Sequence, residues 1–164
     1  MTDWRKDRIG SALRGENPTV IARLPAGFVV MGDPQWLPGY CVLLTDRPDA
    51  QRLSDLTRSE RSAYLESMAV VGQAVERACA EADPAFRRVN IEILGNTDTF
   101  LHAHVWPRYD WEPPELVHMP VWLYPPTAAV VDWLYCACHK RAVGRPQTAN
   151  DHPSTPPLTS ESHR

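Results

Sequence analysis

The chain has 164 residues, of which 43% are hydrophobic, and this size and composition predict one domain with a substantial core. A net charge of −3 and an isoelectric point near 6.0 exclude the basic surface that a protein needs to bind duplex nucleic acid. No apolar run follows the charged segment 1–7, and no stretch of about 18 apolar residues exists, so we expect neither a secretory signal nor a membrane span. We therefore expect a soluble, cytoplasmic protein.

The first 45 residues predict a short helix followed by three strands. Residues 4–13 have helical spacing, and the glycine, asparagine and proline after them break that helix. The apolar runs 19–24 and 28–31 are separated by Pro-Ala-Gly, which predicts a hairpin, and 39–45 reads as the next strand.

One long helix is predicted after this strand. Thr57 or Ser59 can cap it, Glu60 lies in its first turn, and Asp83-Pro84 ends it. Its apolar residues recur at helical spacing, at Tyr64, Leu65, Met68, Val71, Ala74, Val75 and Ala78.

Residues 88–107 predict an antiparallel hairpin. The strand 88–94 turns at Gly95-Asn96 and returns as a second strand that contains two histidines. Pro107 cannot donate to a β-ladder, so we expect the second strand to end there.

The remainder of the chain completes the predicted architecture. Residues 111–126 are rich in proline and aromatic residues and predict no regular element, whereas 127–141 predict a last helix. From residue 144 onward the chain is rich in Pro, Ser, Thr and Asn, so we expect a single domain over 1–143 and a disordered tail over 144–164. The predicted fold is α+β, an antiparallel sheet of about five strands with one long helix packed on it and short terminal helices.

His102 and His104 carry the clearest chemical signal. Successive side chains of a strand point to opposite faces, so both imidazoles project from one face while Leu101, Ala103 and Val105 turn into the core. A neutral imidazole serves as a nucleophile, a general base or a metal ligand near physiological pH. The same spacing also fits two ordinary surface histidines on a half-buried strand.

Residues 94–109, Leu-Gly-Asn-Thr-Asp-Thr-Phe-Leu-His-Ala-His-Val-Trp-Pro-Arg-Tyr, closely resemble the active-site strand of the histidine triad (HIT) family. The family motif alternates three histidines with hydrophobic residues, and the Leu-Gly-Asn and Pro-Arg-Tyr flanks are similar to a bacterial branch often described as diadenosine tetraphosphate hydrolase-like. Residues 33–44 and the Met-Pro-Val-Trp at 119–122 resemble further family segments, so the likeness covers about residues 15–125. Phe100 stands where most members carry the first histidine, so this chain has a dyad.

The resemblance implies a HIT-like fold and a nucleotide phosphohydrolase or nucleotidyl transferase. The reaction it implies is attack at the α-phosphate of a nucleotide, such as a dinucleoside polyphosphate, with His102 as the nucleophile that forms a covalent nucleotidyl-histidine. His104 then contacts the phosphate oxygens. In relatives a main-chain carbonyl at the first-histidine position orients the nucleophile, and Phe100 still supplies one. The resemblance also implies a homodimer and no cofactor.

Three residues match family positions that bind the nucleotide. Asp33 matches an acid that accepts hydrogen bonds from the ribose hydroxyls, although a turn aspartate before Pro34 is an alternative. Asn90 and Asn96 match positions near the phosphates, and Asn96 fits equally well as a left-handed turn residue.

For four further residues the sequence is compatible with either a role in binding or a structural role. The hydroxyls of Thr97 and Thr99 can reach phosphate oxygens or belong to a turn. Met31 is a candidate for the apolar slot that holds the base, or a core residue. Arg108 either neutralises phosphate charge or caps the sheet edge.

Two other functions stay open. One is a nucleotide-binding module with little turnover, which the replacement of a histidine by Phe100 favours. The other is a metal-dependent enzyme that uses His102 and His104 as ligands together with Glu92 or Asp110.

The four cysteines do not predict a metal site. Cys41 and Cys79 lie in predicted regular elements, where a cysteine behaves as a small hydrophobe. Cys136-Ala-Cys138-His139 lacks the Cys-x₂-Cys pairs of a structural zinc site. We expect free thiols, which fit a reducing compartment.

Overall fold

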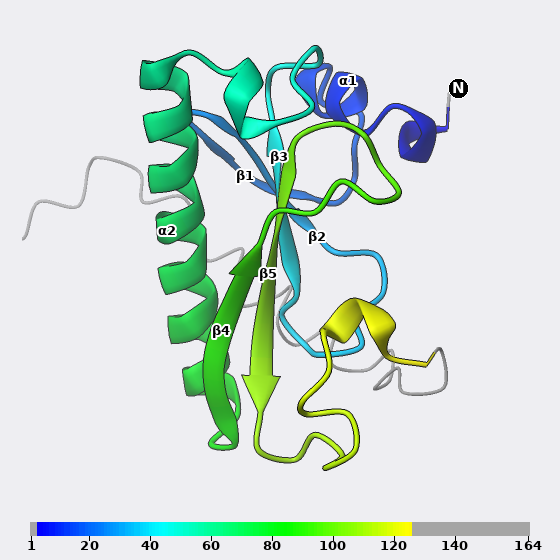
Figure 1. Ribbon diagram of the computed structural model, residues 1–164, viewed down its shortest axis with the longest axis vertical. Coiled ribbons are helices and arrows are strands. Elements are labelled where there is room, and N and C mark those ends of the chain that lie inside the picture. Colours follow the sequence, from blue (N-terminus) through cyan, green and yellow to red (C-terminus); the bar gives the residue numbers. More distant parts are fainter. Residues whose placement is uncertain (1–2, 126–164) are drawn as a thin grey trace, which may run out of the picture.

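A five-stranded antiparallel sheet is the centre of the fold in the computed structural model, which describes residues 3–125 (Figure 1). The strands are β1 Val20–Leu24, β2 Gly27–Met31, β3 Cys41–Thr45, β4 Phe86–Glu92 and β5 His102–Tyr109, and their order in the sheet is β1-β2-β3-β5-β4. The α+β fold predicted from the sequence is confirmed. The predicted helix at 127–141, the tail at 144–164, and Cys136 and Cys138 lie outside the described residues.

The first two strands form the predicted hairpin. Leu24 pairs with Gly27, so Pro25 and Ala26 make the turn. Every residue of β2 and of β3 is buried, which matches the uninterrupted apolar runs of these segments.

The long helix α2, Arg58–Ala82, packs along one face of the sheet and contacts β2, β3, β4 and β5 (Figure 1). Thr57 is its N-cap and forms a capping box with Glu60, while Asp83 ends it. The buried stripe is narrower than predicted, because Leu65, Ala74 and Ala78 are exposed. Its buried residues are Tyr64, Ser67, Val71, Gly72, Val75 and Cys79, several of them small enough to let the helix approach the sheet closely.

The N-terminal helix is shorter than predicted and comes in two pieces. A 3₁₀ turn, η1 Trp4–Lys6, precedes the helix α1 Arg8–Leu13. Asp7 separates them because its carboxylate accepts a hydrogen bond from the Gly10 amide at 3.0 Å and so caps α1. Two further 3₁₀ turns are η2 Leu53–Asp55 and η3 Val121–Leu123.

The pair β4–β5 is antiparallel as predicted, but two details of that prediction are wrong. Gly95-Asn96 is not a tight turn: residues 93–101 form a long connection, which docks on the core where the Leu101 amide donates to the Ala50 carbonyl at 2.8 Å. β5 also continues through Pro107 to Tyr109. The β3 partner register ends at Val105, so Pro107 has no strand on that side and its missing N–H costs no ladder bond.

Within residues 3–125 no helix is long and apolar enough to cross a membrane.

Candidate active site

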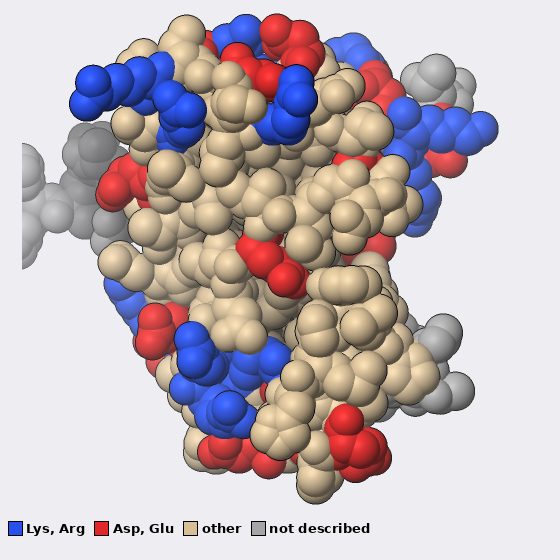
Figure 2. All heavy atoms as spheres, in the orientation of Figure 1, with Lys and Arg blue, Asp and Glu red and all other residues tan. Residues whose placement is uncertain are grey.

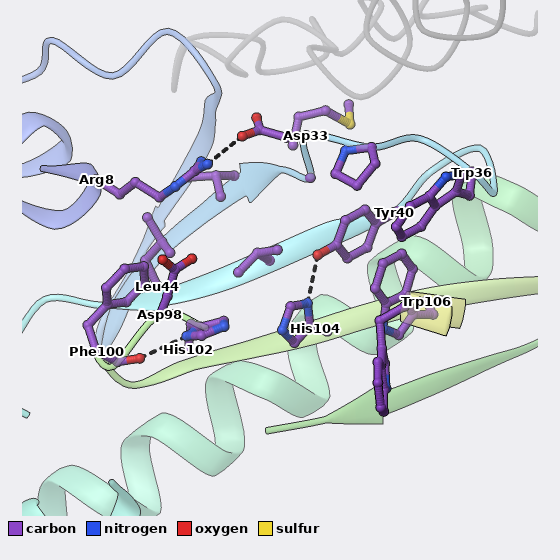
Figure 3. Close-up of a pocket in the computed structure, with 16 residues that line it drawn as sticks. Arg8, Asp33, Trp36, Tyr40, Leu44, Asp98, Phe100, His102, His104 and Trp106 are labelled. Carbon is purple, nitrogen blue, oxygen red and sulfur yellow. Dashed lines mark hydrogen bonds and ion pairs between the residues drawn. The ribbon is translucent and has the colours of Figure 1, made fainter. Parts of the chain in front are cut away.

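The alternation of β5 divides its side chains between a core and a cleft. Leu101, Ala103 and Val105 are at most 1% exposed in the core beneath α2, whereas His102 and His104 point to the opposite face, as predicted. A cleft of about 240 Å³ opens there, built from β2, β3, β5 and the loop after β2, with α1 at its edge (Figure 3). Small-molecule sites usually measure about 300–1,000 Å³, so the volume of this cleft lies just below that range.

The hydrogen bond of His102 fixes the tautomer of its imidazole ring. Its Nδ1 lies 2.8 Å from the carbonyl oxygen of Phe100 (Figure 3). A carbonyl oxygen can only accept, so Nδ1 carries a proton, and in the neutral tautomer with this arrangement Nε2 keeps its lone pair. The carbonyl contact expected from the resemblance is therefore present although the first histidine is replaced. The arrangement gives the cleft a preoriented nitrogen nucleophile or base.

His104 is held in a neutral form. Burial and, second to it, the neighbouring His102 lower its pKa to about 4, against a smaller opposing effect of Asp98. Its Nδ1 lies 2.6 Å from the hydroxyl of Tyr40, whose own pKa is raised by burial. Tyr40 therefore keeps its proton, and Nδ1 is the acceptor that the structure offers to it. The proton of neutral His104 is then on Nε2, where it can donate to a ligand oxygen.

A stack of aromatic rings forms one wall of the cleft (Figure 3). The ring centroids of Tyr40 and Trp106 are 3.5 Å apart, and those of His104 and Trp106 are 5.7 Å apart with nearly parallel planes. Trp36 lies 6.3 Å beyond Trp106. The indole N–H of Trp106 donates to Glu92 at 2.9 Å, which fixes the ring. The rings stack on one another and are almost fully buried, with Trp106 2% and Tyr40 4% exposed, so they form a rigid apolar wall.

The loop between β2 and β3 owes its shape to two glycines. A side chain at Gly32 would collide with the ring of Tyr40, since a Cβ built there lies 2.0 Å from it. Gly39 has a φ of +89°, a left-handed conformation that favours glycine and sets the direction of Tyr40. Gln35 ties the loop together by donating to the Gly32 and Tyr40 carbonyls, each at 2.8 Å.

Asp33 lies at the edge of the cleft, on this same loop, and forms an ion pair with Arg8 of α1 (Figure 3). Its side chain is 37% exposed and that of Arg8 is 23% exposed. The carboxylate thus faces the ligand space with a cation already beside it. A ribose bound here would share Asp33 with Arg8.

The other predicted nucleotide-binding residues are not all brought together. Met31 lines the cleft. Asn90 pairs with Trp106 across β4 and β5 and lies on the same face but outside the cleft lining, and Asn96 is exposed in the connection. Thr97 and Thr99 are exposed and line a neighbouring hollow.

Arg108 is not available to a phosphate. It is 6% exposed, its Nε donates to Glu112 at 2.9 Å, and its guanidinium also donates to the Val117 carbonyl and the Tyr124 hydroxyl. The Glu112 carboxylate is pushed to a higher pKa by burial, but its hydrogen bonds from Arg108 and Tyr124 outweigh this and lower the pKa. This closed network is structural, so the phosphate role weighed for Arg108 is wrong.

The metal-enzyme alternative finds no support in the described part of the chain. Nowhere in residues 3–125 do three His, Cys, Asp or Glu side chains gather so that they could hold a metal ion. Glu92, one of the two carboxylates considered, accepts from Trp106, and Asp110 is 3.8 Å from Arg87.

Comparisons with known proteins agree with this architecture at the level of the fold. A scan against protein-family models and a search of curated protein sequences find no match. Among solved structures, a histidine triad protein from Sinorhizobium meliloti 1021 is similar with a TM-score of 0.65 at 20% identity, over 87% of this chain and 93% of that one. The chain has the histidine triad fold.

Two more structures with the histidine triad fold extend the comparison. A histidine triad protein from Marinobacter aquaeolei VT8 has a TM-score of 0.62 at 16% identity, over 74% of this chain and 83% of that one. A zinc-bound histidine triad family protein from Mycobacterium smegmatis has a TM-score of 0.53 at 19% identity, over 80% and 91%. Identities this low establish the arrangement of helices and strands and leave the site to be argued from its own geometry.

Sequence reasoning missed several cleft residues, among them Tyr40, Trp106, Arg8 and Asp98. Trp106 had a visible signal, because it continues the alternation of His102 and His104 along β5. Tyr40 and Arg8 had none, since they reach the histidines only through the packing of distant segments.

Proposed function

We propose that this protein is a nucleotide phosphohydrolase or nucleotidyl transferase that acts at the α-phosphate through a covalent intermediate on His102. The observation that carries this proposal is the hydrogen bond from His102 Nδ1 to the Phe100 carbonyl at 2.8 Å. In the neutral tautomer that this bond selects, the lone pair of Nε2 is free within a cleft that has an aromatic wall and a carboxylate at its edge. The histidine triad fold supports the same reaction by analogy.

In the first step, Nε2 of His102 forms a bond to the α-phosphorus while the bond from phosphorus to the leaving-group oxygen breaks in line. His102 becomes a cationic nucleotidyl-imidazole, whose proton stays on Nδ1 and is donated in a hydrogen bond to the Phe100 carbonyl. His104 donates Nε2–H to a non-bridging oxygen and so stabilises the charge that builds up there. In the second step, water or another acceptor attacks phosphorus, the P–N bond breaks, and the proton of the acceptor leaves to solvent.

The side chains that line the cleft support one orientation of the nucleotide. The base lies against the apolar side lined by Tyr40, Trp106 and Met31, and Asp33 accepts from the ribose hydroxyls, with Arg8 either displaced or kept as a second partner of the carboxylate. Met31 ends β2 and Asp33 lies two residues later, so the proposed contacts to the base and to the ribose come from one short segment. We further propose a homodimer and a cytoplasmic location, as expected from the sequence.

A second candidate is a nucleotide-binding module with little turnover. The observation that favours it is the side chain at position 100, which is a phenyl ring 5.0 Å from His102 and offers no proton to a leaving group. The two candidates differ in whether a covalent species forms.

The deciding experiment is to incubate the protein with a dinucleoside tetraphosphate, quench in alkali, where P–N bonds survive, and measure its intact mass. We expect a fraction of the wild type to gain the mass of one nucleotidyl group, with the adduct mapped to His102. His102→Ala should gain none. His118→Ala is the matched control, because His118 is exposed and outside the cleft lining, and it should behave as wild type. Binding without any adduct would favour the module.

A further inference from the structure

A second hollow, of about 310 Å³, lies beside the cleft between the N-terminal segment and the loop before β5. Three cations of the N-terminal segment line it, Arg5, Lys6 and Arg8, and the hydroxyl residues Thr97 and Thr99 face them from the loop. We propose that this hollow binds the distal phosphates of the substrate's leaving group. This inference rests on the proposed function and names the substrate class of the same site.

The hollow adjoins the cleft. Arg8, Asp98 and Phe100 line both spaces, and the Phe100 ring lies 5.0 Å from the imidazole of His102 (Figure 3). A chain of phosphates that begins at a phosphorus atom next to His102 would pass Phe100 to enter the hollow.

The cleft by itself has too little positive charge to bind a polyphosphate. Arg8 is the one cationic side chain among the described residues that line the cleft, and it is already paired with Asp33, while Asp98 adds a further negative charge. A polyphosphate chain carries several negative charges, so the cleft alone cannot neutralise it. The hollow adds two cations, Arg5 and Lys6, beside Asp98, which lines both spaces, and Asp7, which is paired with Arg14.

These cations are available to a ligand. Lys6 makes no ion pair with any residue in 3–125, and Arg5 is 61% exposed with its nearest carboxylate, Asp3, at 3.9 Å. Asp7 also lines the hollow, but its carboxylate caps α1 and is 3.0 Å from Arg14, so its charge is already compensated. Figure 2 shows basic and acidic side chains gathered over the region of η1 and α1, at the upper right of that view.

The hydroxyls complete the site. Thr97 and Thr99 are exposed and make no side-chain hydrogen bond within the described residues, so both can donate to phosphate oxygens. The substrates that gain from this hollow are nucleotides whose leaving group carries two or more phosphates. A nucleoside diphosphate, whose leaving group is a single phosphate, has no distal phosphates for the hollow to bind.

The test uses the double variant Arg5→Ala/Lys6→Ala in the full chain. One arm measures kcat/KM for a nucleoside tetraphosphate and for the corresponding diphosphate. We expect the tetraphosphate value to fall about 10-fold, the scale of two exposed charge interactions with a multivalent anion, and the diphosphate value to stay within about twofold. The matched control Arg58→Ala/Arg61→Ala removes the same charge from the start of α2 and should leave both values unchanged.

A second arm needs no turnover, because it measures the binding of inorganic tripolyphosphate by calorimetry. The double variant should bind it about 10-fold more weakly than wild type, and the difference should shrink as salt is raised. If the wild type turns over nucleotides but the variant changes neither the substrate ratio nor tripolyphosphate binding, the hollow is not a phosphate site and the proposed function stands. If tripolyphosphate binding depends on Arg5 and Lys6 but no nucleotide is turned over, the hollow stands and the proposed function fails.

Discussion

The two halves of β5 place polar side chains on the same face of one strand, yet they differ in what those side chains are free to do. In the first half, His102 and His104 each use one ring nitrogen for a contact within the protein and keep the other for the cleft. In the second half, Arg108 is enclosed with Glu112 and Tyr124, and its donors are consumed.

The covering segment makes the difference. Residues 112–124 fold over the end of β5 and supply the partners of Arg108, whereas the histidines face an open cleft. A polar residue at a regular position of a strand is therefore functional or structural according to what lies above it. Variants in the first half should change activity and spare stability, and variants in the second half should do the reverse.

The largest effect is expected for the nucleophile. His102→Ala should lower kcat by at least about 10³-fold, because the covalent route is lost. The unfolding free energy should fall by only about 1 kcal/mol, the scale of one hydrogen bond. Steady-state kinetics and urea titration measure the two quantities, and a variant that kept wild-type turnover would remove His102 from the mechanism.

In the second half of β5, Arg108→Ala should lower the unfolding free energy by about 3–5 kcal/mol, because Glu112 is left buried without its counter-ion. Arg88→Ala is the matched control: Arg88 pairs with Arg108 across the sheet but is exposed, and its loss should cost at most about 0.5 kcal/mol. Equal losses for the two variants in denaturant titrations would show that the Arg108 network contributes little.

Phe100 tests whether the missing histidine sets the leaving group. A general acid typically contributes about 10²–10⁴-fold, and Phe100 can donate no proton, so polyphosphates should be better substrates than phosphoramidates. Phe100→His should raise kcat/KM for a nucleoside phosphoramidate, by about 10²-fold at the low end of that range, and change the polyphosphate value less. A uniform change in both values would contradict this.

Asp33 tests the ribose contact at the edge of the cleft. Asp33→Ala should weaken nucleoside monophosphate binding by about 1–3 kcal/mol, the scale of a charged hydrogen bond. A 2′,3′-dideoxy analogue lacks the hydroxyls and should lose little. Calorimetry with both ligands checks this, and equal losses would assign Asp33 to the loop and its ion pair with Arg8.

The smallest effect concerns His104 and pH. Its folded pKa of about 4 lies below the ordinary 6.5, so between these values the unfolded chain binds more protons and stability falls as pH falls. His104→Gln removes this contribution, and its unfolding free energy should decline less than that of wild type from pH 7 to pH 4.5. Parallel curves would mean that His104 titrates alike in both states.

The sequence by itself determined the elements and the position of the reactive pair. The β-branched and apolar runs of the first strands, the Thr57–Glu60 capping box and the alternation around His102 are local signals, and each predicted its element. The same alternation put both imidazoles on one face and the aliphatic residues in the core. The resemblance then supplied the histidine triad fold that the solved structures show.

Tertiary structure decided which residues surround that pair. Tyr40 reaches His104 over 64 positions of sequence and Arg8 reaches Asp33 over 25, and no local pattern encodes such contacts. The continuation of β5 through Pro107 depended on the end of the β3 register, and the closed network of Arg108 depended on a segment folding back over it. Propensity acts through neighbours in the chain, whereas burial, hydrogen-bond partners and pKa values depend on neighbours in space, so only the folded chain could fix them.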